Sequence, residues 1–215
     1  MIKIISILTI LLSSLFSYND IFDKGLDFRE GVINYSVSGS EHGSITIYSK
    51  DYGKSLVIYS RLNKNFINKK RETLKYITNK WIYELNLQTK VGIKYYNLNY
   101  LEDIKFQNLS YTQQDTFSKN YKTSIKDIQK TSHGYDLISS IVDGKYLEKA
   151  KQYDLVFQKE VNLFGFHSKT ELLQIDKITI DSDIFNLPND IKFTIDNKKN
   201  KTLSSKANYF IKSFL

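Results

Sequence analysis

The sequence of 215 residues contains no cysteine, one proline and one tryptophan. Without cysteine the chain can form no disulfide, has no thiol to carry a lipid and offers no thiolate ligand to zinc or an iron–sulfur cluster. The fold must therefore depend on an ordinary hydrophobic core. A single domain of nearly this length buries roughly 70% of the surface of its unfolded chain, which is enough for a stable fold.

The sequence also lacks the motifs of common active sites. It has no Gly-x-Ser-x-Gly elbow, no glycine-rich phosphate loop and no His-Glu-x-x-His zinc pattern. The histidines lie in three separate segments, at His42, His133 and His167. The acidic pairs Glu102 with Asp103 and Asp181 with Asp183 lack the loop spacing of a calcium site. We therefore predict no catalytic residue, no metal site and no cofactor, with a hydrolase built from dispersed residues as a weaker alternative.

The amino terminus has the pattern of a secretory signal peptide. One charge, at Lys3, precedes an apolar run from Ile4 to Phe16 that only serine and threonine interrupt. This run is shorter than the ~20 residues that a helix needs to cross a bilayer, and a small residue, Ser17, follows it. We predict cleavage after Ser17, one mature domain of residues 18–215, and export to the periplasm without a stable membrane anchor. An uncleaved anchor is the alternative.

The chain is basic, with 31 lysine and arginine residues against 23 aspartate and glutamate residues and a net charge of +8. Loss of Lys3 with the signal peptide leaves 30 against 23, or +7. The basic residues are spread along the chain, with short runs only at residues 68–71 and 197–201. Since an exported chain meets little nucleic acid, we predict no nucleic-acid partner, whereas the charge could assist contact with an anionic membrane surface.

The clearest local pattern is a β-hairpin from Gly43 to Arg61. Apolar and polar residues alternate in both arms, as they do in half-buried strands, and the turn Lys50-Asp51-Tyr52-Gly53 joins them. Similar alternation predicts a strand before the hairpin, which makes a meander of three, and a strong strand from Trp81 to Gln88. Further strands are predicted at residues 72–78, 93–96, 135–141, 152–158, 161–166, 169–176 and 177–180.

Residues 98–131 follow a different period. Leu98, Leu101 and Ile104 recur at a spacing near three to four, and Phe117, Tyr121, Ile125 and Ile128 continue it, which predicts one or two amphipathic helices. A helical insert between two groups of strands packs most simply across the face of the sheet. We therefore predict a mainly β fold: a strongly curved antiparallel sheet, an open half-barrel, with this insert on its concave face and a short helix near the carboxyl terminus.

Aromatic residues are abundant, with 16 tyrosines and 13 phenylalanines. They suit a plain β core, but a curved sheet lined by aromatic and aliphatic residues also suits a cavity for an acyl chain. Both interpretations stay open for the predicted concave face. Its residues, which we predict to contact an apolar ligand, are Ile45, Ile47, Leu56, Ile58, Trp81, Tyr83 and Leu85.

A resemblance rests on the segments Gly31-Val-Ile-Asn-Tyr35, Gly43-x-Ile-Thr-Ile-Tyr48, Asp51-Tyr-Gly53-Lys54, Trp81-Ile-Tyr-Glu-Leu85 and Phe185-x-Leu-Pro188. With these segments, over about residues 31–190, the chain resembles exported proteins related to periplasmic lipoprotein carriers of the LolA and LolB type. The resemblance implies a half-barrel, closed by helices, that holds lipoprotein acyl chains. Arg61 and Arg71 are the candidates for the arginine that latches such a barrel to its helices, and neither lies in a matching motif.

These observations together predict a periplasmic, non-catalytic binding protein. Its expected partners are a lipid or the acyl chains of a lipoprotein, together with an envelope protein that delivers or receives them. The alternative is a structural or protein-interaction module of the envelope with a fully packed core. A cavity on the sheet would favour the first interpretation, and a filled interior would favour the second.

Overall fold

The computed structural model of the chain describes residues 25–64, 69–124, 130–132, 135–142, 145–150, 155–163, 166–213 and 215. The predicted signal peptide and its cleavage position lie outside these residues, as do His133 and residues 125–129 of the predicted insert. Among the described helices, none combines the length and the apolar character needed to cross a membrane.

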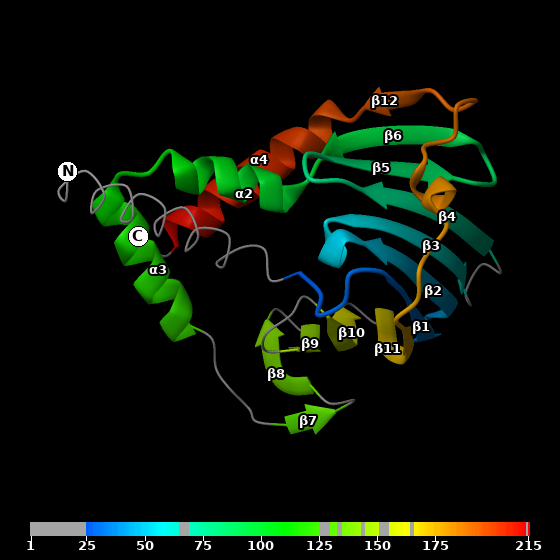
Figure 1. Ribbon diagram of the computed structural model, residues 1–215, viewed down its shortest axis with the longest axis horizontal. Coiled ribbons are helices and arrows are strands. Elements are labelled where there is room, and N and C mark those ends of the chain that lie inside the picture. The colour runs from blue at the N-terminus through cyan, green and yellow to red at the C-terminus, as the bar shows by residue number, and fades with distance from the viewer. Residues whose placement is uncertain are drawn as a thin grey trace, which may run out of the picture.

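One open sheet contains the described strands, in the order β12-β6-β5-β4-β3-β2-β1-β11-β10-β9-β8-β7 (Figure 1). The strands are β1 (Gly31–Gly39), β2 (Glu41–Lys50), β3 (Ser55–Lys64), β4 (Lys69–Ile77), β5 (Trp81–Asn86), β6 (Val91–Tyr96), β7 (Lys130–Ser132), β8 (Tyr135–Val142), β9 (Lys145–Ala150), β10 (Val156–Leu163), β11 (Phe166–Asp176) and β12 (Phe193–Ile195). Neighbouring strands are antiparallel except for β12, which runs parallel to β6. A mainly β fold with predominantly antiparallel pairing is confirmed, and the parallel pair of β12 with β6 makes the described sheet a mixed one.

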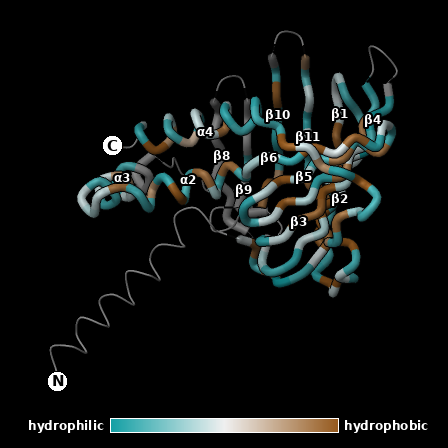
Figure 2. Tube along the Cα trace, turned by 90° about the horizontal axis from the view of Figure 1, so that it is seen from above, coloured by the Kyte–Doolittle hydropathy of each residue, from teal (hydrophilic) through white to brown (hydrophobic). Residues whose placement is uncertain are grey.

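The helices are α2 (Leu98–Gln107), α3 (Tyr111–Ser124) and α4 (Asn197–Lys212). They lie beyond one end of the sheet, as both the front view and the view from above show (Figures 1 and 2). Phe106, Phe117 and Ile211, one from each helix, form a buried cluster that holds them together. Helices are thus confirmed over residues 98–107 and 111–124 of the predicted insert, whereas its last residues, 130–131, belong to β7. The helices stand at the end of the sheet, and among the described residues those of α2 line a pocket of the sheet.

Polar residues mark the start of each helix. The side chain of Asn97 accepts a hydrogen bond from Asn99 N–H at 3.2 Å, and that of Asp196 accepts one from Lys199 N–H at 2.8 Å. At α3, Ser110 and Gln113 form a reciprocal capping box. These caps satisfy backbone donors that have no partner within the first turn of a helix. The cap at Asp196 explains why α4 is longer than the short terminal helix that the sequence predicts.

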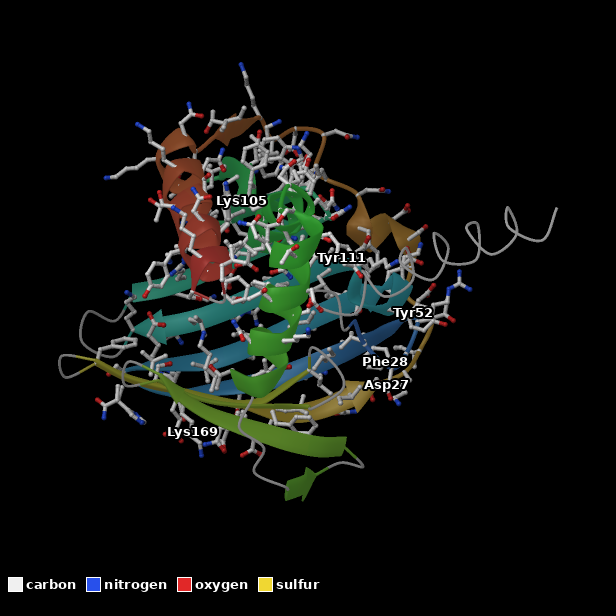
Figure 3. The ribbon with its side chains drawn as sticks, turned by 90° about the vertical axis from the view of Figure 1, so that its left-hand side faces the viewer. Asp27, Phe28, Tyr52, Lys105, Tyr111 and Lys169 are labelled. Atoms are coloured by element: carbon white, nitrogen blue, oxygen red, sulfur yellow. The ribbon has the colours of Figure 1, made fainter. Side chains whose placement is uncertain are left out.

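The predicted hairpin is confirmed as β2 and β3. Its turn is the 3-10 element η1 (Asp51–Gly53), in which Asp51, Tyr52 and Gly53 have φ angles of 53°, 59° and 92°. Glycine adopts such angles without steric cost, which accounts for Gly53 at the end of the turn. Leu26 N–H donates to the Tyr52 carbonyl at 2.8 Å, so the segment before β1 lies against this turn, with Phe28 and Tyr52 near each other (Figure 3).

A long connection links the two halves of the sheet. Strand β11 pairs with β1, whereas β12 pairs with β6, so residues 177–192 must cross the strands between them. Figure 1 shows this connection, with the 3-10 element η2 (Ser182–Phe185), passing in front of β3 and β4. The predicted strand at residues 177–180 is therefore wrong, because these residues belong to the connection.

The connection covers a second layer of core on that face of the sheet. Val57, Tyr76 and Leu85 are only 2%, 6% and 3% exposed there. Phe193 meets Tyr83 edge to face with ring centroids 5.3 Å apart, and it lies directly opposite Gly92. A side chain at Gly92 would bring its Cβ within 2.7 Å of the Phe193 ring, so glycine permits this close approach. The face under the connection is thus an ordinary packed core, and we call it the covered face.

Candidate functional site

A pocket of about 900 Å³ lies on the face of the sheet opposite the covered face. We call this the pocket face. Side chains from β1 to β5 line the pocket, β10 and β11 add residues to it, and α2 and the segment before β1 complete it. The apolar lining residues are Leu26, Ile33, Ile45, Ile47, Leu56, Ile58, Ile77, Ile82 and Val156.

Strand alternation and register place these apolar residues side by side. Successive side chains of a strand point to opposite faces, so Ile45 and Ile47 share one face of β2. Ile47 pairs with Ile58 of β3, and Ile77 of β4 pairs with Ile82 of β5. Branched aliphatic side chains from four neighbouring strands therefore form a continuous apolar surface.

Four of the seven predicted ligand-contacting residues line this pocket. They are Ile45, Ile47, Leu56 and Ile58, all from the hairpin. The other three, Trp81, Tyr83 and Leu85, lie on the covered face, because the pocket-lining residue of β5 is Ile82. The prediction that all seven share one face is therefore wrong.

The three misplaced residues have clear structural partners. Trp81 stacks on Tyr96 with ring centroids 4.4 Å apart, and the ammonium of Lys94 lies 5.2 Å from the Trp81 ring. Tyr83 packs on Phe193, and Leu85 is buried beneath the connection to β12. The predicted alternation is present in β5, but its apolar side packs in a second, covered core.

The far wall of the pocket comes from the other half of the sheet. The hydroxyl group of Tyr35 on β1 donates a hydrogen bond to the Val156 carbonyl at 2.9 Å. The Tyr35 side chain thus reaches past the intervening strand β11. Leu155 and Phe157 pack in the same buried cluster as Tyr35 and Ile33. Burial raises the pKa of Tyr35, which keeps its hydroxyl protonated as a donor. This cluster closes the β1 side of the pocket.

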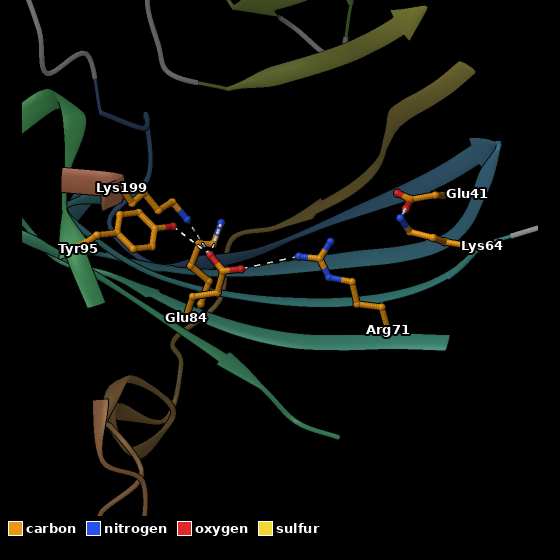
Figure 4. A network of polar contacts seen from close by, with 7 residues as sticks. Glu41, Lys64, Arg71, Glu84, Tyr95 and Lys199 are labelled. Atoms are coloured by element: carbon orange, nitrogen blue, oxygen red, sulfur yellow. Dashed lines mark hydrogen bonds and ion pairs between the residues drawn. The ribbon is translucent and has the colours of Figure 1, made fainter. Parts of the chain in front are cut away.

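Glu84 on β5 is the centre of a charged network on the pocket face (Figure 4). Its carboxylate oxygens lie 3.7 Å from Arg71 Nη2, 3.7 Å from Lys75 Nζ and 3.4 Å from Lys199 Nζ. Tyr95 donates a hydrogen bond to the same carboxylate at 3.0 Å. Burial alone would raise the pKa of Glu84, but the charges of Lys75 and Lys199 and the Tyr95 hydroxyl outweigh it and hold the pKa below its usual range.

Of the two latch candidates, Arg71 joins this network, whereas Arg61 pairs with Glu72 on the other face at 3.2 Å. From α4 it is Lys199 that reaches this network, and it also lies 3.5 Å from the Tyr95 ring centroid. No local pattern in the sequence indicates the pair of Lys199 and Glu84, because the two residues are separated by more than a hundred positions.

The remaining polar candidates have local structural roles. Asp181 accepts a hydrogen bond from Asp183 N–H at the start of η2, and Asp183 accepts one from the Asn186 side chain. In the described part of the chain, no three histidine, aspartate or glutamate side chains lie close enough together to hold a metal ion. Glu102 of α2 differs, because burial and the adjacent carboxylate of Asp103 raise its pKa to about 7.

No protein-family model matches the chain, and no curated protein is significantly similar to it in sequence. An uncharacterised conserved protein from Thermus thermophilus aligns over 85% of this chain and 99% of its own, with 11% identity and a TM-score of 0.46. Two crystal forms of PNGF-II align over 83% of this chain with 13% and 12% identity and TM-scores of 0.40 and 0.43. The chain spans about a third of the length of PNGF-II.

The arrangement of the site suits binding. Its apolar surface can accept a flexible hydrocarbon. Its polar lining groups are amides, hydroxyls and lysines, as in Asn79, Asn97, Tyr100 and Lys54, together with the carboxylate of Asp103. Among the described lining residues there is one serine, Ser60, and no histidine. The pocket thus offers an aliphatic surface and the positive charge of its lysines to a ligand.

Proposed function

We propose that this protein binds the acyl chain of a lipid or of a lipidated partner in the pocket, without catalysing a reaction on it. The single observation that carries the proposal is the continuous aliphatic surface of Ile45, Ile47, Leu56 and Ile58 inside a pocket of about 900 Å³. Pockets that bind small molecules typically measure roughly 300–1,000 Å³ and are mostly apolar. Each methylene group taken out of water contributes about 0.8 kcal/mol, so a long chain gains substantial affinity there.

The wider setting belongs to the same proposal. A cleaved signal peptide of residues 1–17 would deliver the protein to the periplasm, where lipids and lipoproteins are in transit. In this proposal the sheet acts as a half-barrel, with β1 to β5 as its floor and β10 and β11 as its second wall. Helix α2 stands at one end of the pocket through Asn97, Asn99, Tyr100 and Asp103, and would cover the end of a bound chain.

The test uses protein purified from the periplasm without detergent, examined by native mass spectrometry and titrated with a fluorescent fatty acid. Ile58→Asp places a carboxylate on the apolar surface and should abolish uptake. Tyr59→Asp is the matched control, because Tyr59 is the next residue of β3, lies on the opposite face and sits beside Arg61. It should bind as the unaltered protein does, and circular dichroism of both variants checks that they are folded.

A copurifying lipid or saturable fatty-acid uptake that is lost in Ile58→Asp and kept in Tyr59→Asp would support the proposal. An apo mass together with no uptake would refute it. The protein would then be pursued as an interaction module of the envelope by crosslinking in cells.

A further inference from the structure

The charges around the pocket are strongly unequal. The lining includes three lysines, Lys54, Lys75 and Lys159, and one acidic residue, Asp103. The three lysines come from different parts of the fold. Lys54 precedes β3, Lys75 lies within β4, and Lys159 lies on β10 in the second wall. The pocket therefore presents positive charge from several sides of an otherwise aliphatic surface.

Lys75 is set into the apolar surface itself. It pairs across the strands with Ile58 on one side and with Glu84 on the other. Ile77, two residues along the same face of β4, also lines the pocket. An ammonium beside branched aliphatic side chains favours a ligand that carries an anionic group next to a hydrocarbon.

Glu84 does not neutralise this charge. Its single carboxylate is shared by Arg71, Lys75 and Lys199, so the network keeps an excess of two positive charges. Lys54 and Lys159 form no ion pair with any other described residue. Amide side chains, from Asn79, Asn97 and Asn99, make up much of the remaining polar lining. An anion entering the pocket would thus meet several cations and few carboxylates.

We propose that the ligand is an anionic amphiphile, whose carboxylate or phosphate group is bound by Lys75 while its hydrocarbon lies on the isoleucine surface. Lys159, on the second wall of the pocket, attracts the anion through its charge. This inference rests on the proposed function and adds the chemical class of the ligand. Lys54, at the hairpin end of the pocket, attracts the same group as it enters. Attraction between such charges weakens as salt rises, because ions screen the partly exposed lysines.

The experiment compares four probes of equal chain length by competition against a fluorescent fatty acid. Oleate carries a carboxylate, oleyl phosphate a phosphate, oleyl alcohol no charge and oleylamine a positive charge. The variants are Lys75→Gln and Lys159→Gln. Lys192→Gln serves as the control, because it removes the same charge from an exposed residue just before β12. Thermal unfolding of each variant checks that the fold is kept.

The two anionic probes should bind at least tenfold more tightly than the alcohol, since a charged hydrogen bond contributes about 1.5–3 kcal/mol. Lys75→Gln should reduce this preference about tenfold and Lys159→Gln should reduce it less, because Lys159 acts on the anion from a greater distance, whereas Lys192→Gln should leave it unchanged. The ratio of oleate to oleyl phosphate identifies the preferred anion. Equal binding of the alcohol and both anions would overturn the inference and leave the proposed function standing. Failure of all four probes would overturn both.

Discussion

The Nζ atom of Lys199, in the first turn of α4, lies 3.4 Å from Oε2 of Glu84 on β5. The same lysine lies over the Tyr95 ring, and the neighbouring Asn200 accepts a hydrogen bond from Tyr96 N–H at 2.7 Å. These contacts join the carboxyl-terminal helix to the pocket face of the sheet. Since α4 also packs on α2, they fix the position of the helix that reaches the pocket.

Glu84→Gln should lower the free energy of unfolding by about 1–3 kcal/mol, because three cations lose their shared carboxylate in a partly buried place. Chemical denaturation at pH 7 measures this. Glu72→Gln is the matched control, since Glu72 of the neighbouring strand β4 also lies between two cations and has a side chain of similar exposure, 20% against 19%, but lies on the opposite face of the sheet. An equal loss of stability in both variants would show that the Glu84 network has no special role.

The stability of the protein should fall as pH rises from about 4.5 to about 7 through Glu102. Its pKa is about 7 in the folded chain and ~4.3 in an unfolded one, so the folded state holds a proton that the unfolded state has released. Glu102→Gln removes this cost. The variant should be more stable than the unaltered protein at pH 8, by on the order of 2 kcal/mol, and equal to it at pH 4.

Denaturation curves at pH 4, 6 and 8 test this prediction. Asp115→Asn on α3 is the control, because the Asp115 side chain is exposed and pairs with Lys119 one turn away on the same helix. If the difference in the free energy of unfolding between Glu102→Gln and the unaltered protein were the same at pH 4 and pH 8, it would contradict a raised pKa of Glu102 in the folded chain.

Leu85→Ala should separate stability from ligand binding. Leu85 is 3% exposed on the covered face, so its truncation should cost about 2–4 kcal/mol through the cavity that it leaves. Fatty-acid affinity of the folded variant should stay within twofold of the unaltered protein, because the pocket lies on the other side of the sheet. A large loss of affinity at temperatures where the variant is folded would instead indicate that Leu85 contacts the ligand.

Gly92→Val should loosen the connection that covers the second core. A valine side chain would collide with the Phe193 ring and with Ile191, whose atoms lie 2.7 Å and 2.8 Å from the position of a Cβ. We expect a loss of about 1–3 kcal/mol and faster proteolysis within residues 186–192. Val91→Ala, next to it and 58% exposed, should change neither property. Unaltered proteolysis in Gly92→Val would contradict the packing described above.

Local patterns in the sequence predicted local structure well. The hairpin, its glycine turn, the strand from Trp81 and the helices after Leu98 all follow from the spacing of neighbouring residues. The sequence could not assign Trp81, Tyr83 and Leu85 to a face. Alternation groups residues within one strand, but which side of one strand joins which side of the next depends on register and on what covers each face.

The long-range parts of the site were missed for a related reason. Strand β12 has only three residues, and its parallel pairing with β6 depends on a connection that crosses the sheet. The lysines of the pocket looked like part of a general excess of basic residues. Only the fold brings Lys75 and Lys159, from opposite halves of the sheet, to one pocket.

The most direct test of lipid binding is photolabelling with a diazirine-bearing fatty acid, followed by mass spectrometry of the labelled peptides. Labels competed by unlabelled oleate should fall on the pocket face, at Ile45, Ile47, Leu56, Ile58, Ile77 and Ile82. Labels confined to the covered face around Tyr83 and Leu85, or labelling that oleate does not compete, would contradict a lipid-binding pocket in this protein.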